Sequence, residues 1–253
     1  MNAEICVVGG KLQGIEALYL AGKASFKTVL IDRRSNPPAL NLADKFYKLD
    51  LLKERDEAAK LISRVDAVLP ALEEEEALKV LEQICGETET PYMQDNSAFK
   101  ITSNKLSSIK LFDRLGLPYP RLHPEASFPL IVKPVFGSGS QAVHLVRNRR
   151  EFEEAVRKVY EVDKNYLAQE YVSGLFLSLE ILGDRKTFHP MQITGLEFDE
   201  TYGCKRVLAP CRIPGKIAWE IREIGVRLAE GLKLKGLTDL QVAVDRENVK
   251  VIE

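Results

Sequence analysis

The sequence contains no apolar run long enough to span a bilayer, and its first residues show no basic segment followed by an apolar stretch. Its formal net charge is only −1, which gives no reason to expect a nucleic acid or an anionic membrane as a partner. The four cysteines and three histidines are scattered without the spacing of a zinc or redox site. These absences predict a cytoplasmic protein with reduced cysteines.

Short apolar runs alternate with helical patterns over residues 1–92. They predict, in order, a strand at Glu4–Val8, a helix at Ile15–Lys23, a strand at Lys27–Ile31, a strand at Asp66–Leu69 and a helix at Glu73–Cys85. Strands that alternate with helices favour a doubly wound parallel sheet. We therefore expect an α/β domain over residues 1–92.

The pattern changes after Pro91, where strands become longer and follow one another with turns between them. The expected elements are a helix at Leu106–Leu115, strands at Pro129–Lys133 and Ala142–Val146, a helix that starts after Asn148, strands at Tyr166–Glu170, Leu175–Leu182, Lys186–Leu196 and Lys205–Leu208, a helix at Lys216–Leu232 and a strand pair at Leu237–Val244 and Val249–Glu253. This order predicts an α+β half with an antiparallel sheet. We divide it into lobes at residues 93–172 and 173–253.

One lysine comes directly before a loop of small residues. Lys133 ends a predicted strand, and Gly137, Ser138, Gly139 and Ser140 follow. Backbone N–H groups of such a loop can surround phosphate oxygens, and a lysine on a rigid strand adds a positive charge. A glycine-rich hairpin beside a surface lysine remains an alternative, because the spacing is not that of a P-loop.

Two further segments suggest a nucleotide site. The extended stretch Gln169, Glu170, Tyr171 and Val172 can offer backbone groups to an adenine edge, although a buried strand explains it equally well. Gln241 and Glu253 lie on the final strand pair and can direct oxygen ligands to a Mg²⁺ ion that bridges ATP phosphates.

These segments, in this order, resemble the ATP-grasp superfamily over nearly the whole chain. The resemblance implies that Lys105, Lys133 and the loop from Gly137 to Gln141 hold the phosphates. It further implies that the linker at Glu170–Val172 holds adenine, and that Gln241 and Glu253 bind the metal. The implied activity is a carboxylate–amine ligation that uses ATP and Mg²⁺ and passes through an acyl-phosphate, with an N-terminal pre-ATP-grasp domain before the ATP-grasp lobes.

A closer resemblance is to the ligases of pyrrolysine biosynthesis. The segments that carry it are Val7–Gly14, Val29–Asp32, Val65–Pro70, Ser178–Glu180 and Asp199–Tyr202 with Cys204. The resemblance implies that the carboxyl group of 3-methyl-D-ornithine is joined to the ε-amine of L-lysine. Another ATP-grasp amino-acid ligase, or a protein like carbamoyl phosphate synthetase, stays open as an alternative.

The sequence departs from the family in two places. Many ATP-grasp enzymes carry a ribose-binding Glu seven residues after the linker acid, where this chain has Leu177. The family also continues past the position of Glu253 with a further metal-binding Asp or Asn. The resemblance therefore implies a truncated form that binds ATP and catalyses poorly.

Within the ligase interpretation, two groups of residues are candidates for binding the amino acids. Lys11, Leu12 and Gln13 follow the first strand, at the sheet edge where open α/β sheets bind ligands. Ser178 and Glu180 alternate with leucines and so share one face of a strand. Asp239 is a further candidate, although a solvated acid at the end of a strand explains it better. Solvated turn and strand-end positions explain the same residues without a ligand.

Two other function classes remain open at this stage. A nicotinamide-dependent dehydrogenase would use the glycine turn and place Asp32 on the ribose, but Gly9, Gly10 and Gly14 lack the G-x-G-x-x-G spacing. A non-catalytic nucleotide-binding relative is the second. The oligomeric state is open as well, with a homodimer as one expectation.

Overall fold

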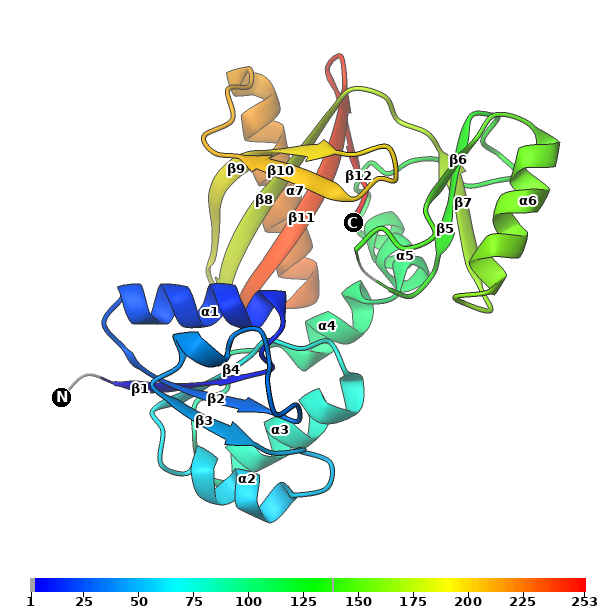
Figure 1. The fold of residues 1–253 in the computed structure, drawn as a ribbon. Helices are drawn as coiled ribbons and strands as arrows, with labels where there is room; N and C mark the ends of the chain where they lie inside the picture. The colour runs from blue at the N-terminus through cyan, green and yellow to red at the C-terminus, as the bar shows by residue number, and fades with distance from the viewer. Residues whose placement is uncertain (1–2, 138) are drawn as a thin grey trace. The chain divides into compact units, whose positions relative to one another are not determined.

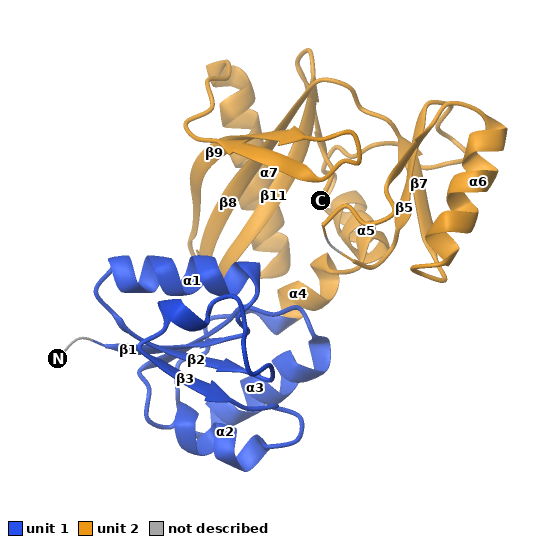
Figure 2. Ribbon diagram, viewed as in Figure 1, with its two compact units in different colours: residues 1–96 blue, residues 97–253 orange. Residues whose placement is uncertain are grey.

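The computed structural model describes residues 3–137 and 139–253, so the predicted phosphate contact at Ser138 lies outside the described residues. The chain divides into two compact units, residues 1–96 and 97–253 (Figure 2). The predicted division of the second unit into lobes at Val172 stays a prediction. In the described part of the chain, no helix is long and apolar enough to cross a membrane.

The first unit is built on a four-stranded parallel sheet in the order β3-β2-β1-β4 (Figure 1). Its elements are β1 (Glu4–Val8), α1 (Leu12–Lys23), β2 (Lys27–Asp32), η1 (Leu40–Leu42), β3 (Lys45–Lys48), α2 (Arg55–Ile62), β4 (Ala67–Pro70) and α3 (Glu75–Glu87). Alternate residues of each central strand point to opposite faces. Val7 and Leu30 pack with Leu18 of α1, whereas Val8 and Ile31 pack on the side of α2 and α3. The predicted doubly wound parallel sheet is confirmed.

The first half of the second unit contains a three-stranded antiparallel sheet in the order β6-β5-β7. Its elements are α4 (Asn96–Thr102), α5 (Lys105–Leu115), β5 (Leu130–Pro134), β6 (His144–Val146), α6 (Arg149–Tyr160) and β7 (Tyr166–Glu170). The Asn148 side chain accepts the Glu151 amide at 3.0 Å, and Asn148 Nδ2 donates to the Glu151 carboxylate at 2.7 Å. Asn148 thus caps α6 at the predicted start, while the Glu151 carboxylate accepts the Arg147 amide at 2.8 Å and not the Asn148 amide of a full capping box.

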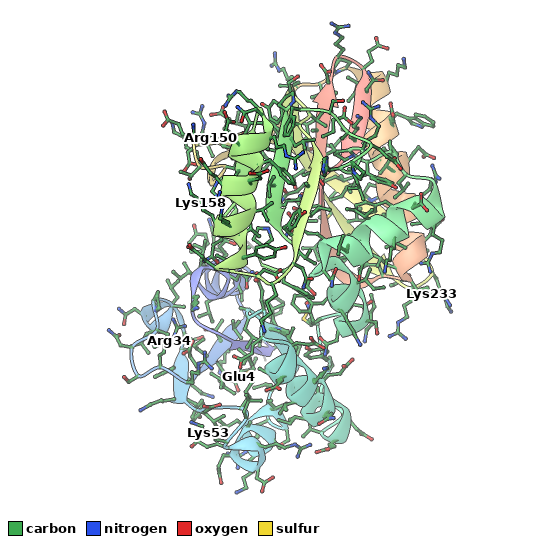
Figure 3. The ribbon with its side chains drawn as sticks, turned by 90° about the vertical axis from the view of Figure 1, so that its right-hand side faces the viewer. Glu4, Arg34, Lys53, Arg150, Lys158 and Lys233 are labelled. Atoms are coloured by element: carbon green, nitrogen blue, oxygen red, sulfur yellow. The ribbon has the colours of Figure 1, made fainter. Side chains whose placement is uncertain are left out.

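Helix α6 covers one face of this small sheet. Leu130 and Val132 of β5 pack with Ala155 and Val159 of α6 in a buried cluster. The outer side of the helix is charged: Arg150 pairs with Glu154 one turn on, and Arg150 and Lys158 are labelled on α6 in Figure 3. Such i,i+4 pairs support an exposed helix face, and nothing else is required to explain them.

The second half of the unit contains a five-stranded antiparallel sheet in the order β10-β9-β8-β11-β12. Its elements are β8 (Leu175–Asp184), β9 (Phe188–Phe198), β10 (Cys204–Leu208), α7 (Gly215–Leu232), β11 (Lys235–Asp245) and β12 (Asn248–Val251). Helix α7 lies across one face of this sheet (Figure 1), where Leu179 and Leu240 pack against Ile221 and Leu228. The opposite face carries polar side chains, and the candidate site is built there.

Candidate functional site

Lys133 is a nearly buried cation on β5. The side chains of Leu130 and Val132 face α6, so Lys133 projects from the opposite face of the small sheet. It is 5% exposed, and its ammonium group has no hydrogen-bond or ion-pair partner among the described residues. Burial lowers the pKa of Lys133 to about 8; the carboxylate of Glu253 opposes this shift and the ammonium of Lys105 adds to it. A buried ammonium group without a partner is costly to the free protein and suited to an anionic ligand.

Lys105 is the first residue of α5 and is also nearly buried. The preceding Asn104 caps the helix by accepting the Ser107 amide at 3.0 Å, and the Lys105 amide donates to the Val135 carbonyl at 3.0 Å. Lys105 Nζ donates to the Gly137 carbonyl at 2.8 Å and lies 3.1 Å from Glu253 Oε1. This lysine therefore joins the small-residue loop to the end of the large sheet.

The described residues of the small-residue loop adopt the left-handed backbone region. Gly137, Gly139 and Ser140 have φ values of 111°, 68° and 57°. A Cβ atom added at Gly137 or Gly139 would meet no atom within 4 Å, so backbone conformation, and not close packing, favours glycine there. Backbone N–H groups in turn conformations can point toward a common side, which suits phosphate oxygens.

Gln241 of β11 and Glu253 face each other through an irregular strand pairing. The amides of Ile252 and Glu253 both donate to the Gln241 carbonyl, at 2.8 and 3.3 Å, and the Gln241 amide donates to the Glu253 carbonyl at 2.8 Å. Two residues thus oppose one, as in a β-bulge. Because Val251 points into the core, regular alternation would send Glu253 there as well. The bulge instead allows the Glu253 carboxylate to reach Lys105.

Asp239 joins a row of polar side chains on β8 and β11. Its Oδ1 accepts a short hydrogen bond from the Ser178 hydroxyl, and its Oδ2 accepts one from Gln241 Nε2 at 3.2 Å. Glu180 is directly opposite Asp239 in the strand register. Although part of Asp239 reaches solvent, the protein atoms crowded around its carboxyl group raise its pKa by desolvation. Ser178 and Glu180 share one face of β8, as predicted, and the register places Asp239 on the same face of the sheet.

The linker between the two sheets starts at the end of β7. Gln169 is 4% exposed and lies on the same face of the small sheet as Lys133. The amides of Glu170 and Tyr171 donate to backbone carbonyls at 2.8 and 3.1 Å. The Val172 amide has no hydrogen-bond partner among the described residues. A free N–H group at this position can donate to a ring nitrogen of a ligand.

The candidates in the first unit lie at the carboxyl end of β1. Lys11 immediately precedes α1, Leu12 is 71% exposed, and Gln13 Nε2 donates to Glu73 Oε1 at 2.9 Å. They are thus at the sheet edge where open α/β sheets bind ligands.

Asp32, the candidate ribose-binding acid of a dehydrogenase, is already fully engaged. Its carboxylate accepts the Gly10 amide at 2.7 Å and two hydrogen bonds from the Arg34 guanidinium at 2.9 and 2.7 Å. Burial alone would raise the pKa of Asp32, but these hydrogen bonds lower it. This carboxylate stabilises the turn after β1, and the structure gives the dehydrogenase interpretation no support.

Two residues that contact the linker were not among the predicted site residues. Lys250 Nζ lies 2.8 Å from both carboxylate oxygens of Glu170, and the Arg121 amide donates to the same carboxylate at 3.2 Å. The one signal that could have found Lys250 is a single charge within the otherwise apolar run Val249–Ile252.

The expected metal site is small. Among residues 3–137 and 139–253, no group of three or more His, Cys, Asp or Glu side chains is arranged to hold a metal ion. Gln241 and Glu253 nevertheless offer oxygen atoms, the ligand type that Mg²⁺ prefers, and Mg²⁺ commonly takes its other ligands from phosphates and water. The donor set therefore fits a metal that arrives with a nucleotide.

Comparison with known families assigns both units. The ATP-grasp domain matches residues 102–253, and the PylC-like N-terminal domain matches residues 5–91. The 3-methyl-D-ornithine–L-lysine ligase of Methanosarcina acetivorans is 36% identical over 251 residues, which are 98% of this chain and 65% of that protein. The chain therefore spans about 65% of the length of this curated relative.

Solved structures share the fold at lower sequence identity. N5-carboxyaminoimidazole synthetase from Staphylococcus aureus, complexed with ADP, superposes with a TM-score of 0.81 at 19% identity, covering 99% of this chain and 69% of that chain. The L-amino acid ligase from Bacillus licheniformis gives a TM-score of 0.73 at 20% identity, covering 100% of this chain and 66% of that one. These likenesses confirm the predicted architecture.

Proposed function

Because the chain belongs to the ATP-grasp family, we propose that it binds Mg-ATP on the polar face of its second unit and uses it to join a carboxylic acid to an amine. The observation that carries this proposal is the pair of nearly buried lysines, Lys105 and Lys133, beside the loop at Gly137. Among the residues that the structure describes, the carboxylate that pairs with these two ammonium groups is that of Glu253, which leaves a net positive charge. A triphosphate would neutralise it.

The adenine base would occupy the linker at Glu170–Val172. The Val172 amide, which has no hydrogen-bond partner in the described part of the chain, supports this, because it can donate to an adenine ring nitrogen. Val172 is 7% exposed and Gln169 is 4% exposed, so the surface that would contact a flat aromatic ring is largely shielded from water. The triphosphate would then extend from the linker toward Lys133, on the same face of the sheet.

Gln241 and Glu253 would hold Mg²⁺, which would supply positive charge to neutralise the phosphates. In the free protein Glu253 is paired with Lys105 at 3.1 Å, so each of the two charged groups has a partner of opposite charge. When phosphates bind to Lys105, the Glu253 carboxylate becomes available as an oxygen ligand. The loop residues Gly137, Gly139 and Ser140, with Ser138 between them, would surround the terminal phosphates.

We further propose that the acid is 3-methyl-D-ornithine and the amine is the ε-amine of L-lysine, as the name of the Methanosarcina acetivorans relative suggests. A carboxylate oxygen attacks the γ-phosphorus and ADP leaves. The amine then attacks the acyl carbon, loses a proton, and releases phosphate with the original carboxylate oxygen. No side-chain nucleophile is required, because positioning and charge neutralisation perform the catalysis.

The amino-acid substrates carry ammonium groups that need anionic partners. Asp239 and Glu180 face each other across β8 and β11 and offer two carboxylates, with the Ser178 hydroxyl beside them. Lys11, Leu12 and Gln13 of the first unit remain candidates for binding an amino-acid substrate, with Lys11 for a carboxylate group. We expect the enzyme to act in the cytoplasm, and a homodimer remains a prediction.

Calorimetry and product analysis test the proposal at two levels. Mg-ATP should bind to the 253-residue chain, and Lys133→Ala should weaken that binding without unfolding the protein. The full-length protein, given ATP, 3-methyl-D-ornithine and lysine, should release ADP and an amide whose mass equals that of the two amino acids less water. ATP binding with no amide from any amino-acid pair would favour the non-catalytic alternative, and no ATP binding would refute the proposal.

A further inference from the structure

Lys250 of β12 contacts the linker from a strand that has no other evident role in the site. We infer that Lys250 is a positioning residue for the nucleotide base: it holds the Glu170–Val172 linker in the conformation that presents the Val172 amide. This inference rests on the proposed ATP site. It concerns the base and not the phosphates.

The ion pair between Glu170 and Lys250 is well formed and partly shielded. Lys250 Nζ lies 2.8 Å from each oxygen of the carboxylate, and the two side chains are 25% and 24% exposed. Burial would raise the pKa of Glu170, but the hydrogen bonds from Lys250 and the Arg121 amide lower it. Fully exposed pairs add little to stability, whereas a shielded, bidentate pair holds a defined geometry.

Glu170 is held on its backbone as well as on its side chain. Its amide donates to the Arg121 carbonyl at 2.8 Å, while the Arg121 amide donates back to the Glu170 carboxylate at 3.2 Å. Lys250 supplies the third contact from the other sheet. The residue that begins the linker is thus fixed from two sheets at once.

The far end of the linker is fixed by a close backbone approach. Gly174 has φ 122°, and a Cβ atom there would lie 2.1 Å from the Val244 carbonyl oxygen on β11. Val244 pairs with Val249 of β12, next to Lys250. The linker is therefore attached to the same strand pair at both of its ends, and Tyr171, Val172 and Ser173 lie between the attachments.

Strand β12 itself is well supported, so Lys250 projects from a rigid base. Val249 and Val251 on either side of it are buried in the core under α7. The Val251 amide, on the outer edge of β12, donates to the Pro118 carbonyl at 2.8 Å. Removing the Lys250 charge should consequently leave the strand in place and release only the linker.

Loss of this contact should affect ligands that carry a base and spare those that do not. Lys250→Met keeps the length of the aliphatic side chain and removes the charge. We expect it to weaken Mg-ATP and Mg-ADP binding by about tenfold, the scale of one charge-assisted hydrogen bond, and to reduce the preference for ATP over GTP. Binding of Mg-tripolyphosphate, which has no base, should stay within about twofold of wild type, because it depends on Lys105 and Lys133.

Calorimetry with these ligands on the 253-residue chain tests the inference. Lys250→Arg should restore most of the ATP affinity, and Lys250→Met should have little further effect in a Glu170→Gln background. Lys216→Met is the matched control: Lys216 pairs with Glu247 at 2.8 Å, both side chains are exposed, and neither belongs to the site.

Three results separate the inference from its premise. If wild type binds tripolyphosphate and ATP equally weakly, the proposed nucleotide site fails, and the role of Lys250 fails with it. If wild type binds ATP and Lys250→Met binds it equally well, the positioning role alone is overturned. Equal loss of ATP and tripolyphosphate binding in Lys250→Met would also overturn it, because Lys250 would then support the whole site and not the base.

Discussion

Replacing Lys133 with methionine should stabilise the ligand-free protein near pH 7 while it weakens nucleotide binding. Lys133 is 5% exposed, and burial lowers its pKa from the ordinary 10.5 to about 8. At about 1.4 kcal/mol per pKa unit, keeping this group charged costs the folded state about 3 kcal/mol below pH 8. Methionine has a similar length and no charge, so the variant avoids that cost.

The effect of Lys133 on the free energy of unfolding changes with pH in a defined direction. Between about pH 8 and 10.5, the unfolded chain keeps a proton on Lys133 that the folded protein has released. The contribution of Lys133 to the free energy of unfolding therefore rises with pH across this window. In Lys133→Met no group titrates at this position, so the free energy of unfolding of the variant shows no such rise. Burial also raises the pKa of Cys6 to about 12 and of Cys85 to about 11, which lowers stability above their ordinary value of 9. The informative quantity is thus the difference between wild type and variant at each pH.

Urea unfolding followed by the fluorescence of Trp219, the single tryptophan, measures this difference in the unit that contains Lys133. The variant should be more stable by about 3 kcal/mol near pH 7, and the gap should close as pH rises above 8. Lys216→Met, on the exposed start of α7, should show no such gap. A variant that is less stable than wild type at pH 7, with a difference independent of pH, would refute the reasoning about a buried charge.

Three further changes have defined outcomes. Lys105→Ala should weaken Mg-ATP binding by roughly 1.5–3 kcal/mol in calorimetry, since Lys105 Nζ bonds the Gly137 carbonyl and faces Glu253; unchanged affinity would remove it from the site. Asp239→Asn in the full-length enzyme should raise KM for the diamino acids about tenfold and leave KM for ATP nearly unchanged; the reverse pattern would place Asp239 at the nucleotide. Gly174→Ala should destabilise the second unit by roughly 3 kcal/mol in urea unfolding, because the added Cβ would clash with the Val244 carbonyl. Gly215→Ala, at an open helix start, should not destabilise it. Equal stability of the two variants would show that the Val244 backbone can move at little cost.

Elements whose pattern is local were predictable from the sequence. The predicted bounds of β1 and β7 match the structure, because each is a short segment with buried apolar residues that follows or precedes turn residues. Helix α7 was found by its single apolar stripe, which packs on the large sheet. Strand β3 and helix α2 are absent from the predictions. Strand β3 is a mostly exposed edge strand of four residues, and its two lysines hide the strand pattern.

The candidate site was predictable only where residue types carry the signal. The lysine before a glycine loop pointed to Lys133, but its burial depends on tertiary packing that no local pattern encodes. The pairing of Glu253 with Lys105 depends on a bulge, and a bulge reverses the side that simple alternation predicts. The contact between Lys250 and Glu170 joins residues 80 positions apart on two sheets, so no local pattern encodes it.

Transfer of labelled oxygen tests the central claim most directly. The full-length protein is incubated with ATP, lysine and 3-methyl-D-ornithine whose carboxyl group carries ¹⁸O, and the released phosphate is analysed by mass spectrometry. If the carboxylate attacks the γ-phosphorus and the amine then displaces phosphate, each amide formed should deliver one ¹⁸O atom to inorganic phosphate, with ADP as the other product. Amide formation with unlabelled phosphate, or with AMP in place of ADP, would contradict an acyl-phosphate ligase.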